Sequence, residues 1–165
     1  MSYFVQISLV GPSYYEGEAD PRHLILAYDL EEGKIAVRRK RYLEPKDDFS
    51  LVRLKEKDKE ELDALLKEGF KEVVSLVRQK RFGLEAVPYR HAEVQFLDFE
   101  PFLLPDYLFN PGGNDLTDRY EDYPDEKVKA LYRYFQKTAR FLAREAGVEL
   151  PLVPLPQKGE SDYRF

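Results

Sequence analysis

The stretch HLILAYDLEEGKIAVRRKRYL, residues 23–43, decides the fold class that this sequence predicts. Residues 23–30 and 34–43 carry the apolar, β-branched and aromatic side chains that favour strands. Between them stands Glu31-Glu32-Gly33, where the glycine can adopt the left-handed conformation that a short hairpin turn requires. We therefore predict two antiparallel strands joined by a tight turn.

The strand pattern recurs on both sides of this hairpin. Residues 3–10, YFVQISLV, precede it across a polar loop, and residues 91–99, HAEVQFLDF, follow it with apolar side chains at alternate positions. Such alternation is typical of a strand with one buried face. Four strands are therefore expected.

Two amphipathic helices are also predicted. Asp58 and Glu61 form a capping-box pattern, after which apolar side chains keep helical spacing to about residue 81. The second helix begins near residue 122, with acids and a proline in its first turn, and ends at Gly147. Its predicted apolar face consists of Val128, Leu131, Tyr132, Phe135, Ala139 and Leu142.

The order of three strands, a helix, a strand and a helix predicts an α+β fold. We expect a mainly antiparallel sheet of about four strands with the two helices packed on one face. Residues 1–150 are expected to form a single α+β domain, which suits their number. Residues 151–165 begin with closely spaced prolines, so they are predicted to form an extended tail.

Composition excludes several classes of site. The chain has no cysteine, which excludes disulfides, zinc–thiolate sites, iron–sulfur clusters and a cysteine nucleophile. No apolar run approaches the roughly 20 residues of a membrane helix, and the first residues lack signal-peptide features. We therefore expect a cytoplasmic protein with no membrane contact. Charged residues make up 35% and prolines number 11, which favours a thermophilic source.

One side of the second helix is basic. Its cations recur at helical spacing within a strip roughly 80° wide. We call this set the basic helix face: Lys129, Arg133, Lys137, Arg140 and Arg144. Because the net charge is -5, any attraction to nucleic acid must be local. The basic helix face is a candidate contact for phosphates or an acidic protein, and a solvated or internally paired helix face is the alternative.

The acids near the basic helix face are few. Glu126 lies at its edge in the first turn, and Glu145 lies off the strip. We therefore predict that its cations repel one another within the helix rather than form ion pairs.

A shorter basic run, RRKR, occupies residues 38–41, and RQKR occupies residues 78–81. Neighbouring residues of a strand face opposite sides, so the first run cannot form one flat patch. We interpret strand 34–43 as an edge strand that charge protects from aggregation, with nucleic-acid contact as the alternative.

Residues 103–124, LLPDYLFNPGGNDLTDRYEDYP, are predicted to form a long loop that combines acids with aromatic side chains. Such loops often contact partners. We call its candidate residues the acidic aromatic loop: Asp106, Tyr107, Asp115, Asp118, Tyr120, Asp122 and Tyr123. The alternatives are a loop that packs its aromatics on the domain, a calcium turn at residues 112–118, and a loop that binds the basic helix face.

The chain offers little for catalysis. His23 and His91 are its two histidines, and no glycine-rich phosphate loop follows a strand, so we assign no catalytic residues and expect no cofactor. The alternative is a divalent-metal site with Asp29, Glu31 and Asp98 as ligands, as in metal-dependent nucleases. Asp29 and Glu31 also lie where a hairpin turn needs polar residues.

These patterns favour a non-enzymatic binding or regulatory module that contacts a protein or nucleic acid through the basic helix face and the acidic aromatic loop. A divalent-metal-dependent nuclease or phosphodiesterase is one alternative. An inhibitor protein that presents the acidic loop to a basic site on another protein is a second. Self-association through a symmetric interface is also open.

Overall fold

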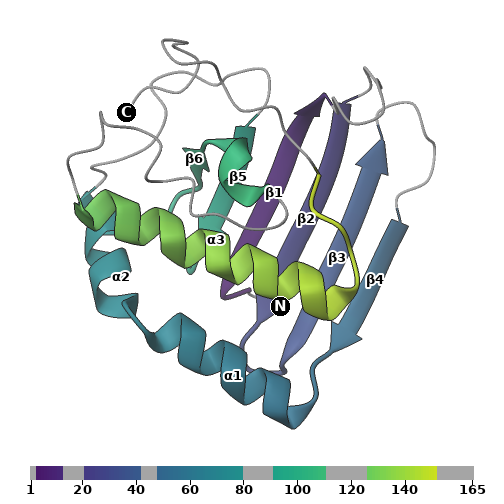
Figure 1. The fold of residues 1–165 in the computed structure, drawn as a ribbon, viewed down its shortest axis with the longest axis horizontal. Coiled ribbons are helices and arrows are strands. Elements are labelled where there is room, and N and C mark those ends of the chain that lie inside the picture. The colour runs from purple at the N-terminus through teal and green to yellow at the C-terminus, as the bar shows by residue number, and fades with distance from the viewer. Residues whose placement is uncertain (1–2, 13–20, 42–47, 80–90, 111–125, 152–165) are drawn as a thin grey trace.

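The computed structural model describes residues 3–12, 21–41, 48–79, 91–110 and 126–151 (Figure 1). In chain order its elements are β1 (Val5–Pro12), β2 (Pro21–Asp29), β3 (Lys34–Arg41), β4 (Asp48–Arg53), α1 (Glu56–Lys67), α2 (Phe70–Gln79), β5 (His91–Phe96), β6 (Phe102–Leu104), the 3-10 helix η2 (Asp106–Phe109) and α3 (Glu126–Ala146). The predicted α+β class is confirmed.

The described strands form one antiparallel sheet in the order β4-β3-β2-β1-β5-β6. β1 lies in the interior of the sheet between β2, its neighbour in the chain, and β5, which is far from it in sequence. The sheet therefore depends on a long-range pairing between its first strand and residues 91–96.

The β2–β3 hairpin is confirmed. Asp29 pairs with Lys34, and Gly33 adopts the left-handed conformation with a φ of 65°. The Gly33 N–H donates to the Asp29 carbonyl oxygen at 2.9 Å. The Asp29 carboxylate also accepts hydrogen bonds from the backbone N–H groups of Glu31 and Glu32, at 3.1 and 3.2 Å. Asp29 thus holds the turn with its side chain as well as its backbone.

The strand count and the edge assignment were wrong. β4 and β6 were not predicted, so the sheet formed by the described residues has six strands rather than about four. Because β4 pairs with β3, β3 has a neighbour on each side and is no edge strand. That position belongs to β4.

The helix predicted over residues 58–81 is two helices. α1 ends at Lys67 and α2 begins at Phe70, with Gly69 between them at a φ of 75°. α1 also begins before Asp58, and its N-cap residue Lys55 makes no side-chain capping bond, so the predicted capping box does not mark the helix start.

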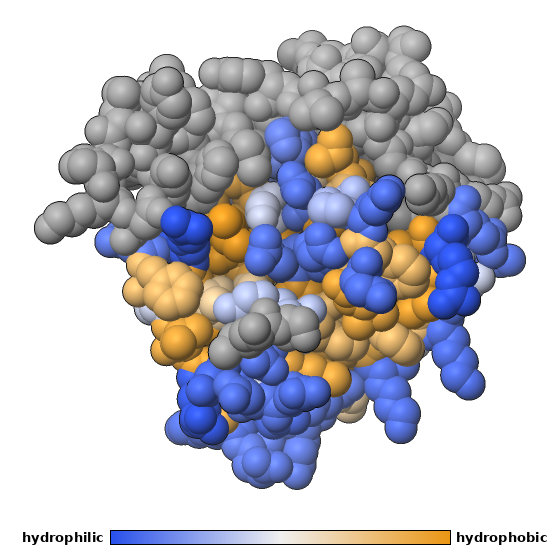
Figure 2. Space-filling model, turned by 180° about the vertical axis from the view of Figure 1, so that it is seen from behind, coloured by the Kyte–Doolittle hydropathy of each residue, from blue (hydrophilic) through white to orange (hydrophobic). Residues whose placement is uncertain are grey.

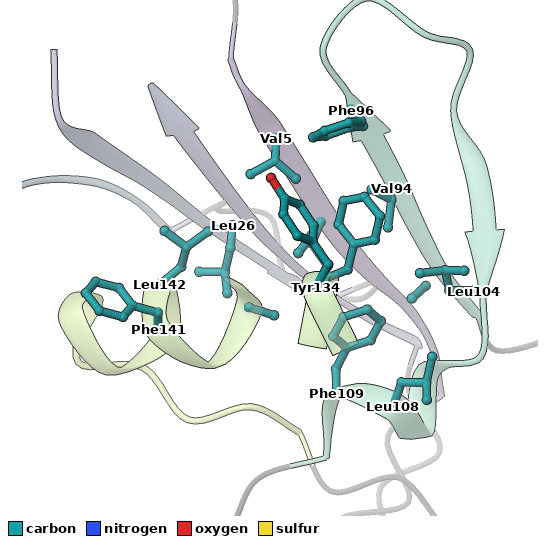
Figure 3. Packing of buried hydrophobic residues seen from close by; sticks show 14 of the residues in the cluster. Val5, Leu26, Val94, Phe96, Leu104, Leu108, Phe109, Tyr134, Phe141 and Leu142 are labelled. Atoms are coloured by element: carbon teal, nitrogen blue, oxygen red, sulfur yellow. The ribbon is translucent and has the colours of Figure 1, made fainter. Parts of the chain in front are cut away.

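α1, α2 and α3 lie on one side of the sheet, as predicted for the two helices (Figure 1). Alternate strand residues face them, and side chains such as Ile7, Val94 and Phe96 are at most 1% exposed. In Figure 3 the sheet residues meet apolar side chains of α3 and η2, among them Tyr134 and Phe109. The core is the layer between the sheet and these helices.

Polar bonds position α3 within this layer. The Tyr134 hydroxyl donates to the Leu66 carbonyl oxygen at the end of α1, at 2.7 Å, and the Gln136 amide donates to the Leu108 carbonyl oxygen of η2, at 2.8 Å. The predicted apolar face of α3 is confirmed, since each of its six residues is buried. Within the described ranges, no helix has the length and apolar content to cross a membrane.

Candidate functional site

The basic helix face lies on α3, and two of its cations form ion pairs within the helix. The Lys129 ammonium group lies 3.5 Å from the Glu126 carboxylate, and only 15% of the Lys129 side chain is exposed. The Arg144 guanidinium lies 3.2 Å from the Glu145 carboxylate and 4.6 Å from the centre of the Phe141 ring. The prediction that these cations do not pair within the helix was wrong.

The exposed part of the basic helix face is narrow. Arg133 and Arg140 are half-buried, and each has an interaction partner within the protein. Lys137 and Arg144 are exposed. A phosphate backbone that approached α3 would therefore meet these two cations first.

The acidic aromatic loop is described only at its start. Asp106 and Tyr107 belong to η2 and are buried, with 4% and 1% of their surface exposed. The side chains of these two residues are therefore covered within the protein. Asp115, Asp118, Tyr120, Asp122 and Tyr123 lie outside the described residues, as do the predicted calcium turn and any contact between this loop and α3.

The alternative metal ligands do not form a site in the described structure. Asp29 is buried and its carboxylate caps the β2–β3 turn, whereas Glu31 and Asp98 are exposed. Among the residues that the structure describes, no group of three His, Cys, Asp or Glu side chains could hold a metal ion. Asp29 therefore acts as a turn residue, the other role that its position suggested.

The basic runs are also divided. Arg38 and Arg39 are both exposed but occupy opposite faces of β3, as strand geometry requires. Arg78 is exposed at the end of α2, and residues 80 and 81 lie outside the described part of the chain. Neither run makes one flat basic patch from its described residues.

The second face of the sheet is a surface that the sequence did not predict. No described helix covers it, and Figure 2 shows apolar surface there between hydrophilic residues. We call it the open sheet face; strand alternation assigns to it Gln6, Ser8, Ile25, Ala27, Lys34, Ala36, Arg38, Phe49, Leu51, Arg53, Glu93, Gln95 and Leu103.

Phe49 and Leu51 are the most prominent side chains of the open sheet face. They are 61% and 52% exposed, and the other large hydrophobic side chains in the described ranges are buried or half-buried. Both stand on β4, two residues apart and on the same side. In the ladder Phe49 lies opposite Arg38, and Leu51 lies opposite Ala36. An aromatic ring, an aliphatic side chain and a guanidinium group therefore stand close together on this face.

A local signal for β4 was present in the sequence. Residues 48–53, DFSLVR, alternate Phe49 and Leu51 with Ser50 and Val52, which is a weak strand pattern in so short a segment. Which face of the sheet stays open depends on where the helices pack, and no local pattern contains that information.

No family model and no curated protein sequence matches this chain. Its function must therefore be argued from the geometry of its surfaces.

Proposed function

We propose that this protein is a non-enzymatic binding module whose main contact surface is the open sheet face. The observation that carries the proposal is the exposure of Phe49 and Leu51 side by side on β4. A single exposed apolar residue is ordinary in proteins, whereas a contiguous apolar surface often marks an interaction site. Ile25 on β2 is half-buried on the same face, whereas Ala27 and Ala36 are buried, so Phe49 and Leu51 supply most of the exposed apolar surface.

The charges beside this surface favour a protein partner. Arg38 and Arg53 stand on the open sheet face next to Phe49 and Leu51. A partner whose apolar side chains are bordered by Asp and Glu would bury Phe49 and Leu51 and meet opposite charge at the border. Aromatic and arginine side chains are also the residue types that carry most binding energy in interfaces.

This proposal is tested with a variant that removes the two apolar side chains. Wild-type protein and Phe49→Ala/Leu51→Ala protein are immobilised and exposed to an extract of the source organism, and the retained proteins are quantified by mass spectrometry. Each candidate partner is then purified and titrated by calorimetry. We expect the Kd for the double variant to be at least about tenfold higher, since loss of a buried anchor costs more than about 1 kcal/mol.

The matched control changes the exposed part of the basic helix face. Lys137→Ala/Arg144→Ala removes two side chains from α3 and leaves β4 intact, so it should keep the wild-type Kd. If wild-type and both variants bind the partner equally, or if only the α3 variant loses affinity, the open sheet face is not the contact surface.

Nucleic-acid binding by the basic helix face is the second candidate function, and the exposure of Lys137 and Arg144 supports it. Fluorescence anisotropy of single- and double-stranded DNA and RNA oligonucleotides, at low and moderate salt, tests it. Binding that weakens with salt and disappears in Lys137→Glu/Arg144→Glu would support a phosphate contact. Absence of binding by the wild-type protein at low salt would eliminate this candidate.

The remaining alternatives have less support. The metal-dependent nuclease needs a carboxylate cluster, and the described residues provide none. The inhibitor hypothesis rests on the acidic aromatic loop, whose Asp106 is buried and whose other acidic residues lie outside the described ranges. A cytoplasmic location and a thermophilic source stay predictions from composition.

A further inference from the structure

The outer edge of β4 carries backbone groups that β3 does not use. The ladder pairs Lys34 with Arg53 and Ala36 with Leu51, and the Leu54 N–H donates to the Gly33 carbonyl oxygen at 2.8 Å. Hydrogen-bonded and non-bonded pairs alternate along an antiparallel ladder. Since the Leu54 N–H points to β3, the alternation places Arg53, Leu51 and Phe49 in non-bonded pairs. Their N–H and C=O groups therefore point away from β3.

β4 has few of the features that protect an edge strand. It is the terminal strand of the sheet formed by the described residues. Its only charges stand at its ends, Asp48 and Arg53, and the four residues between them are uncharged and include no proline. Natural edges usually carry central charges, prolines or bulges that prevent pairing with another strand. The opposite edge, β6, has only three residues. β4 is thus the edge that is suited to accept a further strand.

We infer that β4 pairs in antiparallel orientation with β4 of a second copy of this chain. A two-fold axis at Leu51 places Leu51 opposite Leu51 and Phe49 opposite Arg53 of the second copy. In this register, the outward-pointing N–H and C=O groups of Phe49, Leu51 and Arg53 on each strand form hydrogen bonds with the same groups of the other strand. The same patch lies on both sides of the interface, as a closed two-fold dimer requires.

In this register, the side chains and charges of β4 in one copy are complementary to those of β4 in the other copy. Phe49 and Arg53 both stand on the open sheet face, so each aromatic ring meets a guanidinium group of the other copy, twice per dimer. The acidic end of one strand also lies beside the basic end of the other. A parallel arrangement would place Asp48 near Asp48 and Arg53 near Arg53. Self-complementarity is the reason to assign this edge to a second copy rather than to an unrelated strand.

The placement of the helices is compatible with this dimer. α1, α2 and α3 lie on one side of the sheet (Figure 1), so an axis perpendicular to the sheet keeps them on one side of the dimer. Two six-stranded sheets become one continuous sheet, and the two open sheet faces become one surface. The inference uses the edge of β4 and does not depend on the proposed function, since the Phe49 and Leu51 side chains stay on the open sheet face.

Sedimentation velocity of the full chain over a range of concentrations tests the inference. We expect a species of twice the 19.4 kDa chain mass. Leu51→Lys and Leu51→Glu each place like charges opposite one another at the two-fold axis, so each variant alone should raise the dimer dissociation constant at least about tenfold. An equal mixture of the two variants places opposite charges at the axis, and dimer formation should return.

The matched control is Leu103→Lys, which adds the same charge to the open sheet face on β6 and should leave the dimer intact. Circular dichroism confirms that each variant is folded. Three results would overturn the inference: a wild-type chain that stays monomeric, a dimer that tolerates Leu51→Lys, or a mixture of the two variants that does not restore the dimer. If the wild-type chain is monomeric, the strand that pairs with the β4 edge would have to come from another protein.

Discussion

Gly33 connects the β2–β3 turn to the first helix. Its φ of 65° lies in the left-handed region that favours glycine, and a Cβ atom at this position would lie 2.8 Å from the Lys59 side-chain carbon Cδ. The Lys59 ammonium group in turn forms an ion pair with Asp63 at 2.6 Å. The absence of a side chain at residue 33 therefore leaves space for the stem of an α1 lysine.

Replacement of Gly33 by alanine should destabilise the fold through both effects. The left-handed conformation alone costs about 1–2 kcal/mol for a residue with a Cβ atom. Gly69→Ala is the matched control, because Gly69 has a φ of 75° and its Cβ would meet no atom within 4 Å. In urea unfolding, Gly33→Ala should lower the free energy of unfolding more than Gly69→Ala. Equal losses would show that Lys59 moves aside without cost.

At the residue scale, the sequence predicts where a residue lies in a turn or helix better than which side chains it contacts. The turn role of Gly33 was predicted from its place between two strands, and the apolar face of α3 from helical spacing. The ion pairs of α3 were missed because a helical projection gives the directions of Cα atoms and not the reach of long side chains. Lys129 and Arg144 extend far enough to meet Glu126 and Glu145, three positions and one position away.

Two side chains of α3, those of Tyr134 and Gln136, donate hydrogen bonds to other elements. Gln136 is 2% exposed, and its amide donates to the Leu108 carbonyl oxygen of η2. Thr138 is equally buried, but its hydroxyl donates to the Tyr134 carbonyl oxygen of the same helix, at 2.7 Å. The Gln136 bond joins two elements. The Thr138 bond lies within one helix, and the Tyr134 carbonyl oxygen that accepts it also accepts a backbone hydrogen bond of that helix.

Gln136→Leu should therefore destabilise the protein more than Thr138→Val. The leucine leaves the Leu108 carbonyl without its Gln136 donor, which costs about 1–3 kcal/mol when the group is buried. The valine keeps the shape of threonine and leaves the Tyr134 carbonyl with its backbone donor. Thermal and urea unfolding of both variants measure the difference. A loss in Thr138→Val as large as that in Gln136→Leu would contradict the role given to the bond between α3 and η2.

At the element scale, the sequence predicted the long elements and missed the short ones. α3 and the β2–β3 hairpin have enough residues for a clear periodicity. β6 has three residues, too few for a clear periodicity. β4 and β5 both have six residues, but in β5 Ala92, Val94 and Phe96 alternate with polar residues, whereas in β4 the apolar Leu51 and Val52 are neighbours, which weakens the pattern. Because β4 was missed, the charged strand β3 was assigned to the edge, and the actual edge with its exposed Phe49 was not recognised.

The stability of the whole molecule should decline at alkaline pH because of two buried tyrosines. Burial raises the pKa of Tyr28 above its ordinary value of 10.0, and the hydrogen bond to Asp63 and the charges of Asp63 and Asp29 raise it further. Burial also raises the pKa of Tyr134. In the unfolded chain both hydroxyls lose their protons near pH 10, whereas in the folded protein they retain them. Their contribution to stability is complete below about pH 10 and falls as the pH rises further.

Each of the two tyrosines should add up to about 1.4 kcal/mol per pH unit to this decline. Urea unfolding of wild-type protein and of Tyr28→Phe/Tyr134→Phe, from about pH 9 to about pH 11, measures the slope. The double variant should be less stable at neutral pH but should lose stability less steeply. Parallel pH profiles would show that the two hydroxyls do not stay protonated in the folded protein.

At the scale of the molecule, the sequence predicted the fold class but not the open sheet face. Strand alternation shows that each strand has two faces, but the choice of the covered face depends on how α1, α2 and α3 pack together. That choice places Phe49 and Leu51 in solvent instead of the core. The candidate site is thus a property of tertiary structure.

The central place of β1 determines when the protein can fold during synthesis. β1 is made early, yet it pairs with residues 91–96, and α3, which covers the sheet, follows only at residues 126–146. While the ribosome is still adding these residues, side chains such as Val5 and Ile7 lack the cover that α3 provides. Pairing between segments so distant in sequence is also slow. The nascent chain therefore presents an apolar surface that chaperones can recognise, and the core is completed only after residue 146 has left the ribosome.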